Sequence, residues 1–137
     1  MYERIGGHPT LNRVHEIFYD KVYAHPWLGK FFVGTDRKFI EGQQTDFMSS
    51  AFGGPESYYG KRPQEAHKHM LISEELFEVR SFLLGAALKE AGLPEVEAAE
   101  WMRIDRAFKG KLVKADLSEC IPQYVSQGIL VFEKPEG

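Results

Sequence analysis

Five histidines are the side chains in this sequence best suited to bind a transition metal: His8, His15, His25, His67 and His69. A structural zinc site needs about four nitrogen, sulfur or oxygen ligands. His67 and His69 are two residues apart, so on a helix their side chains point in different directions. The spacing therefore predicts no two-histidine metal site. The ordinary interpretation of any one histidine is a surface residue or a hydrogen-bonded core residue.

Gln44 and Tyr19 are polar side chains at positions where helical spacing predicts burial. Gln44 lies four residues after Ile40 and four before Met48, so these three share one face of a helix. Tyr19 directly follows the inward-facing Phe18. Burying an amide without a partner costs about 1–3 kcal/mol. Two interpretations stay open here: a Tyr–Gln hydrogen bond inside a packed core, or a pair of donors directed at a bound ligand.

The elements that must position these side chains are mostly helices, because the apolar residues recur at helical spacing. The pattern predicts a helix over residues 9–24, with Pro9 in its first turn. A short helical turn is expected over 26–32. A third helix should follow Thr35 or Asp36, either of which can cap it. The apolar positions of that third helix are Phe39, Ile40, Phe47, Met48 and Phe52.

The second half of the chain is also predicted to be helical, after an interruption. Glycines and prolines between residues 53 and 63 exclude regular helix, and a very short helix is expected over 64–69. Ser73 should cap a long helix that Gly92 ends. Pro94 opens a last helix with apolar positions Val96, Trp101, Ile104, Phe108 and Leu112. Residues 129–132 are expected to form a short strand or an extended apolar strip. We therefore predict an all-α fold.

Composition limits the class of protein further. The 137 residues fit one domain, and 43% are hydrophobic, which is ordinary for a globular chain. A net charge of -3 argues against a dedicated nucleic-acid binder. The single cysteine, Cys120, excludes an intrachain disulfide and a multi-cysteine zinc site. The first residues lack the apolar run of a signal peptide, and no stretch is long enough to span a bilayer. We therefore expect a cytoplasmic protein.

Several segments together resemble one known family. They are Tyr2–Gly7, Phe18-Tyr19, Leu28–Phe32, Gln44, Ala51–Pro55, Tyr58–Gly60, Ala66-His67, Ile72 and Phe77. The chain resembles a truncated haemoglobin, most closely group I, with group II as the alternative. The resemblance implies a shortened globin fold in which a two-over-two helical sandwich surrounds haem b. It implies a globin domain over residues 1–115 and a C-terminal extension of unknown structure over 116–137.

The resemblance assigns roles to individual residues. His67 matches the proximal histidine that ligates the haem iron, as in other globins. Tyr19 and Gln44 match the distal residues that hydrogen-bond the gas ligand. Ile40 matches the ligand-gate position. Gln43 stands where many members carry a basic residue or histidine, so no histidine ligation is expected from that position. The expected cofactor-binding residues are Phe32, Phe47, Met48, Tyr58, Arg62 and Phe77.

Charged residues around this expected pocket are candidates for the haem propionates. They are Arg37, Lys38, Lys61 and Arg62, each of which is equally well explained as a plain solvated charge. Arg80 departs from the family, because relatives place an apolar or aromatic residue there. A buried arginine needs a partner, so it should either reach a propionate or lie on a helix rotated relative to the family.

The function that the resemblance implies is reversible binding of O2 and other diatomic gases, such as NO and CO. A hydrogen bond to the charged outer oxygen of bound O2 is worth about 1.5–3 kcal/mol. The alternative is a haem enzyme with the same pocket, a nitric oxide dioxygenase or a peroxidase, for which no residue is assigned as catalytic. Dioxygenation would need an external reductase. A helical interaction module without haem would leave Tyr19, Gln44 and His67 unexplained. Neither a nucleic acid nor a membrane is an expected partner.

Overall fold

The computed structural model describes residues 2–54, 70–114, 120, 129–130 and 132, and over these it is all-helical, as predicted. The elements in chain order are α1 (Tyr2–Ile5), α2 (Gly7–Ala24), the 3-10 helix η1 (Leu28–Phe32), α3 (Arg37–Ala51), α5 (Glu74–Glu90), α6 (Glu95–Arg106) and α7 (Lys109–Leu112). None of the described helices is long and apolar enough to cross a membrane.

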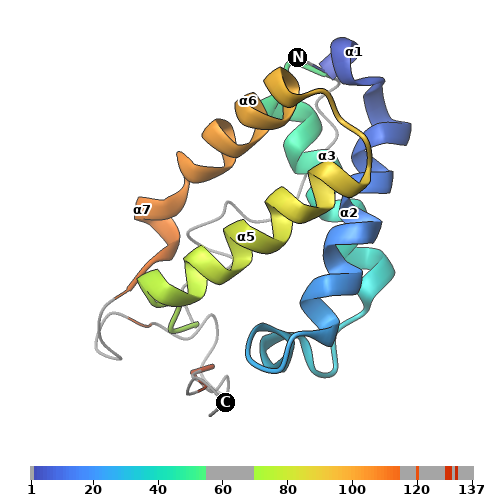
Figure 1. Ribbon diagram of the computed structural model, residues 1–137. Coiled ribbons are helices and arrows are strands. Elements are labelled where there is room, and N and C mark those ends of the chain that lie inside the picture. The colour runs from blue at the N-terminus through green and yellow to red at the C-terminus, as the bar shows by residue number, and fades with distance from the viewer. Residues whose placement is uncertain (1, 55–69, 115–119, 121–128, 131, 133–137) are drawn as a thin grey trace.

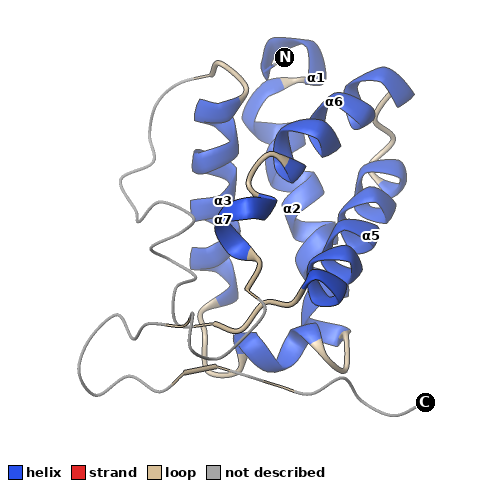
Figure 2. Ribbon diagram, turned by 90° about the vertical axis from the view of Figure 1, so that its left-hand side faces the viewer, coloured by secondary structure: helices blue, strands red, loops and turns tan. Residues whose placement is uncertain are grey.

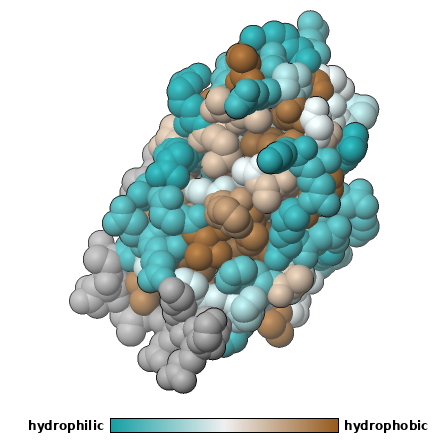
Figure 3. Space-filling model, viewed as in Figure 1, coloured by the Kyte–Doolittle hydropathy of each residue, from teal (hydrophilic) through white to brown (hydrophobic). Residues whose placement is uncertain are grey.

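Helix α2 is the centre of the arrangement. It packs against α3 on one side and α5 on the other, and α5 in turn packs against α6. Figure 1 shows α5 and α6 crossing the front of the molecule, and Figure 2 shows α3 and α5 on opposite sides with α2 between them. Figure 3 shows an apolar area in the middle of the front face, bordered by hydrophilic side chains. The two layers that result enclose the site described below.

The helix boundaries follow from the caps that the sequence predicted. The Asp36 carboxylate accepts a hydrogen bond from the Phe39 backbone N–H, and the Ser73 hydroxyl accepts one from Leu76 N–H. These bonds satisfy backbone donors that have no partner inside the helix. Gly92 ends α5 with a φ of +82°, a conformation that costs glycine little. Each of these expectations is confirmed.

Two apolar positions and one helix were predicted wrongly. Phe39 is 62% exposed and Val96 is 70% exposed, so neither side chain belongs to the core. Both lie in the first turn of their helices. The last helix is also not continuous. It divides into α6 and α7, with Ala107 and Phe108 between them.

The end of the molecule near α1 has a core that side chains fill completely. Trp101 is 1% exposed and packs edge-on against Phe52, with ring centroids 4.9 Å apart. Gly54 lies so close to Tyr2 that an added Cβ would come within 2.5 Å of the tyrosine ring. The glycine at this helix exit is therefore required by close approach.

Two further predictions concern residues 53–69 and the apolar strip 129–132. The very short helix over 64–69 and most of the irregular stretch 53–63 lie outside the described residues. In the apolar strip 129–132, Leu130 forms an isolated parallel bridge with Met70. The extended conformation expected there is confirmed for this residue.

Candidate functional site

A cavity of about 240 Å³ lies among α2, η1, α3, the start of α5 and α7. Its walls are mainly apolar. Eight residues that the sequence singled out line it: Tyr19, Phe32, Ile40, Gln43, Gln44, Phe47, Met48 and Phe77. The structure thus brings together around one space residues that lie up to 58 positions apart in the sequence, Tyr19 and Phe77 being the extremes. The other three assigned residues, Tyr58, Arg62 and His67, lie outside the described residues.

Tyr19 is buried in an aromatic environment on the α2 side of the cavity. Its ring packs edge-on against Phe18 and Phe32, with centroid distances of 5.0 and 6.0 Å. Burial raises the pKa of the Tyr19 phenol well above its ordinary value, although the Arg80 charge acts in the opposite direction. The phenol therefore keeps its proton at neutral pH and is available as a hydrogen-bond donor.

The Tyr19 hydroxyl and the Gln44 amide, both at the cavity, are not hydrogen-bonded to each other. Among the described residues, neither group has a hydrogen-bond partner. The interpretation that a Tyr–Gln hydrogen bond closes a packed core is therefore wrong for the described part of the chain. The two groups are left as polar side chains in a lining that is mainly apolar.

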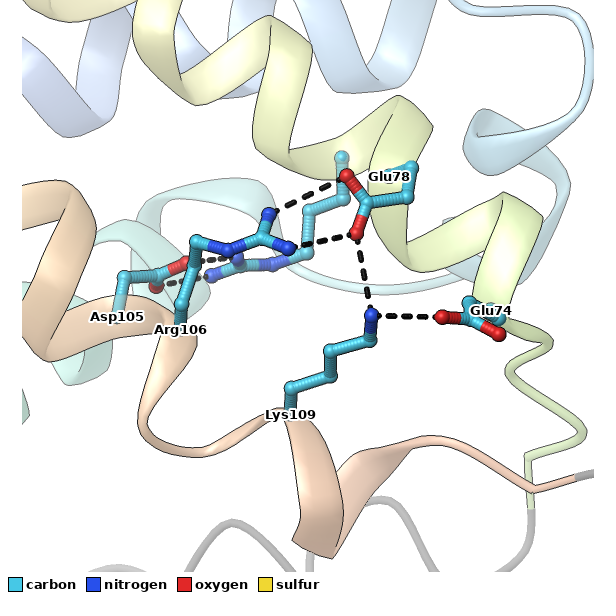
Figure 4. Close-up of polar contacts among 6 residues, drawn as sticks. Glu74, Glu78, Asp105, Arg106 and Lys109 are labelled. Carbon is cyan, nitrogen blue, oxygen red and sulfur yellow. Dashed lines mark hydrogen bonds and ion pairs between the residues drawn. The ribbon is translucent and has the colours of Figure 1, made fainter.

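Arg80 reaches the cavity from α5, and its partner was not foreseen. Its guanidinium donates two hydrogen bonds to the Asp105 carboxylate of α6, at 2.6 and 3.0 Å (Figure 4). It also lies over the Phe18 and Phe77 rings, 5.4 and 5.8 Å from their centroids. Burial would lower the pKa of Arg80, but the Asp105 charge and its hydrogen bonds outweigh this effect and raise it. The partner is thus a carboxylate of the chain itself, an alternative that the sequence had not indicated.

Sequence reasoning also missed Phe108, which lines the cavity beside Phe47. The two rings meet edge-on with centroids 5.3 Å apart. Phe108 was expected as an apolar position within a continuous helix. The break between α6 and α7 places it here, and no glycine or proline marks this break.

Comparison with known proteins shows the family. Residues 1–113 match the family described as bacterial-like globin. The chain is 37% identical over 100 residues to the group 1 truncated haemoglobin GlbN of Mycolicibacterium paratuberculosis, covering 73% of this chain and 74% of that protein. A crystal structure of truncated haemoglobin from Tetrahymena pyriformis in the Fe(III) form matches with a TM-score of 0.78 at 32% identity, covering 83% of this chain and 97% of that one. The chain belongs to the truncated haemoglobins.

A second structural relative supports this globin's shortened fold. The haemoglobin of the thermophilic phototrophic bacterium Chloroflexus aurantiacus matches with a TM-score of 0.74 at 30% identity, covering 82% of this chain and 97% of that one. The resemblance to a truncated haemoglobin of group I and the expected shortened globin fold are therefore confirmed. Haem b is the cofactor of this family, so the chain is a haem-binding globin.

The residues of the cavity fit such a cofactor. A porphyrin presents two large apolar faces, and Phe32, Phe47 and Phe77 supply flat aromatic surface in the lining. An apolar lining with a few convergent polar groups is the usual character of a cofactor site. Tyr19 and Gln44 supply those polar groups.

The described cations proposed for the propionates already have carboxylate partners. Arg37 contacts Glu41 at 2.6 Å and Asp20 at 2.5 Å. Burial alone would lower the pKa of Arg37, but the hydrogen bonds to Glu41 and Asp20 and their charges outweigh this effect and raise it. Lys38 is 80% exposed and lies 3.7 Å from Glu41. Both residues are therefore accounted for as charges within the α2–α3 surface. Lys61, like Arg62, lies outside the described residues.

Proposed function

We propose that this globin binds dioxygen and other diatomic gases reversibly in the cavity, with His67 as the iron ligand and with Tyr19 and Gln44 as hydrogen-bond donors to the gas. The observation that supports the proposal is the pair of polar groups at the cavity without partners among the described residues. Bound haem supplies an iron coordination position at which a diatomic gas can be held. The chain's own residues then decide which gas is held and for how long.

The Tyr19 phenol is suited to the donor role because its proton is retained. Burial keeps its pKa above the ordinary value, so the hydroxyl retains its proton and can donate a hydrogen bond throughout the neutral range. Its ring is fixed between Phe18 and Phe32, which limits the entropy lost when the hydroxyl forms a bond. A hydrogen bond to a charged acceptor contributes about 1.5–3 kcal/mol.

Gln44 is suited to the same role from α3. An amide N–H donates without titrating, so its contribution does not depend on pH. Two donors favour a ligand that develops negative charge on its outer atom over one that does not. We therefore expect dioxygen to gain more than carbon monoxide from Tyr19 and Gln44.

Replacing Tyr19 with phenylalanine tests the donor role. Tyr19→Phe keeps the ring and removes the hydroxyl, and we expect dioxygen to dissociate about tenfold faster or more, since about 1.4 kcal/mol corresponds to a factor of ten. Stopped-flow measurement of dioxygen and carbon monoxide dissociation gives the comparison. Tyr23→Phe is the matched control, because its hydroxyl bonds Thr35 at 2.7 Å and its side chain is not part of the cavity lining. Equal dioxygen off-rates in Tyr19→Phe and Tyr23→Phe would remove Tyr19 from the role.

The assignment of His67 is tested separately. His67→Ala should abolish stable haem uptake, and His8→Ala, whose side chain contacts Tyr2 and Asp46 rather than the cavity, should not. Absorption spectra after haem addition report both results. A five-coordinate histidine spectrum in His67→Ala would show that another residue is the ligand.

A further inference from the structure

The described part of the C-terminal region returns to the wall of the cavity. The family match ends at residue 113, and Leu130 and Phe132 lie beyond it. Leu130 forms a parallel bridge with Met70, and its carbonyl accepts a hydrogen bond of 2.8 Å from the Leu71 backbone N–H. Met70 itself lines the cavity. A residue outside the matched globin region therefore pairs with the backbone of the cavity wall.

Phe132 makes a second set of contacts, with Trp27 and with Phe31 of η1. Its carbonyl accepts a hydrogen bond of 2.8 Å from the Trp27 indole N–H. Its ring packs edge-on against Phe31 of η1, with centroids 4.8 Å apart. Phe31 is another lining residue of the cavity. Leu130 and Phe132 thus connect η1 to the segment 70–72.

The segment 70–72 is held from a second direction as well. The Ile72 carbonyl accepts a hydrogen bond of 2.8 Å from the Lys114 backbone N–H. Residues 70–72 are not helical, so they have no helical backbone bonds of their own. Their N–H and C=O groups must find partners elsewhere, and Leu130 and Lys114 supply two of them.

We propose that Leu130 and Phe132 are positioning residues, which hold the wall segment 70–72 against η1 and thereby slow the loss of haem from the cavity. Loss of a buried cofactor requires the wall to open locally, and contacts present only in the closed state lower the population of the open state. The proposal rests on the proposed function in one respect. His67, the proposed iron ligand, comes three residues before Met70, so a constraint on 70–72 acts on the chain that follows the ligand.

The test compares Phe132→Ala with Phe82→Ala in the full-length, haem-loaded protein. Phe82 is 77% exposed on α5 and does not line the cavity, so the control removes the same ring from a site without these contacts. The rate of haem transfer to an excess of a haem-scavenging protein should rise about tenfold in Phe132→Ala and stay unchanged in Phe82→Ala. Hydrogen exchange at the Leu71 amide should accelerate in parallel, since its acceptor is the Leu130 carbonyl.

A second variant keeps the proposal testable if Phe132→Ala folds poorly. Trp27→Phe retains an aromatic ring, although a smaller one, and removes the indole N–H that donates to the Phe132 carbonyl. We expect faster haem transfer and faster Leu71 exchange, each by a smaller factor than in Phe132→Ala. Haem transfer and Leu71 exchange that match the Phe82→Ala control in both variants would overturn the proposal.

The outcome is separable from that of the proposed function. Exchange at the Leu71 amide reports the attachment of the wall, whichever gas the cavity binds and whichever residue ligates the iron. The dioxygen off-rate of Tyr19→Phe reports the donor role alone. An unchanged Leu71 exchange with a fast dioxygen off-rate contradicts only the positioning role, and the reverse result contradicts only the donor role.

Discussion

Arg80 and Asp105 form the charged pair of a cavity lining that is mainly apolar. Arg80 keeps 21% of its side chain exposed and Asp105 keeps 6%, and both residues line the cavity. The bidentate geometry satisfies both carboxylate oxygens. Removing one partner from such a pair leaves an uncompensated charge, whereas removing both leaves none. We therefore expect the loss of one partner alone to lower the free energy of unfolding more than the loss of both.

The first prediction follows from this asymmetry. Asp105→Asn should lower the free energy of unfolding by about 3 kcal/mol, because the Arg80 charge stays in the wall without its counter-charge. The double variant Arg80→Met with Asp105→Leu should recover most of that loss. Urea unfolding of the haem-loaded proteins, at one haem concentration, measures both.

The matched control for this prediction is an ion pair at the surface. Glu78 pairs with Arg106 and Lys109, and the Glu78 and Arg106 side chains are 47% and 42% exposed (Figure 4). Exposed pairs contribute little because water and salt screen them. Glu78→Gln should therefore change stability far less than Asp105→Asn. A double variant as unstable as Asp105→Asn alone would contradict the argument.

His15 supplies a prediction about pH. It is 1% exposed, hydrogen-bonded to Thr45 at 2.8 Å, and packed edge-on against Trp101. Burial, helped by the Arg80 charge, lowers the pKa of His15 from 6.5 to about 3. Between these values the unfolded chain binds a proton that the folded chain does not. The contribution of His15 to stability is therefore full above pH 6.5 and is lost as pH falls toward 3.

The variant His15→Gln removes this titration. At neutral pH it should be less stable than the unmodified chain, and the difference should shrink by about 1.4 kcal/mol per pH unit between pH 6 and pH 4. Urea unfolding at several pH values gives the difference, and every other titrating group is common to both proteins. A difference independent of pH would show that His15 binds its proton equally well in the folded and unfolded chains, which would contradict the lowered pKa.

At the scale of the helices, the first turn of α5 lies against the cavity. Its N-cap Ser73 accepts the Leu76 N–H, and Leu76 and Phe77 both line the cavity. Ser73→Ala should lower the free energy of unfolding by about 1 kcal/mol, because one backbone donor loses its partner. Ser73→Asp should restore it, since aspartate caps equally well and its charge suits the helix N-terminus. Denaturant unfolding measures the free energy of unfolding of the unmodified chain and of both variants. Equal stability of the alanine and aspartate variants would contradict the role of Ser73 as the cap.

The same elements show what the sequence can predict and what it cannot. Caps and stops are local, so Asp36, Ser73 and Gly92 were found from their types and neighbours. The polar residues on the apolar face of α3 were also visible, because burial of Gln44 without a partner is unfavourable. Exposure of Phe39 and Val96 depends on where a neighbouring helix stops, which periodicity does not contain.

The pairing in the cavity wall could not be read from the sequence at all. Arg80 and Asp105 lie 25 residues apart on different helices, and they meet only through the angle at which α5 and α6 pack. Aspartate in a helix of charged residues is ordinarily a solvated group, so nothing marks Asp105. The break before α7, which brings Phe108 to the cavity, is likewise a consequence of tertiary packing.

For the whole molecule, the core consists of two unlike halves. Toward α1, side chains such as Leu11, Val14 and Trp101 fill the space, and each is 1% exposed or less. Toward η1 and α7, the aromatic walls surround a cavity of about 240 Å³. A short chain has little apolar surface to spare, so a bound cofactor supplies much of the packing in the second half.

Removal of haem should therefore loosen one half and leave the other folded. Amides of α7 and of residues 70–72 should lose protection from hydrogen exchange, because their contacts lie around the cavity. Amides near Val14 and Trp101 should keep most of their protection, because their contacts are made by side chains alone. Hydrogen exchange measured residue by residue, with and without haem, distinguishes this local loss of protection from a loss that is uniform over the chain. Equal loss of protection at Val14 and at Leu71 would mean that the two halves unfold as one unit, and that the filled core near α1 has no stability of its own without the cofactor.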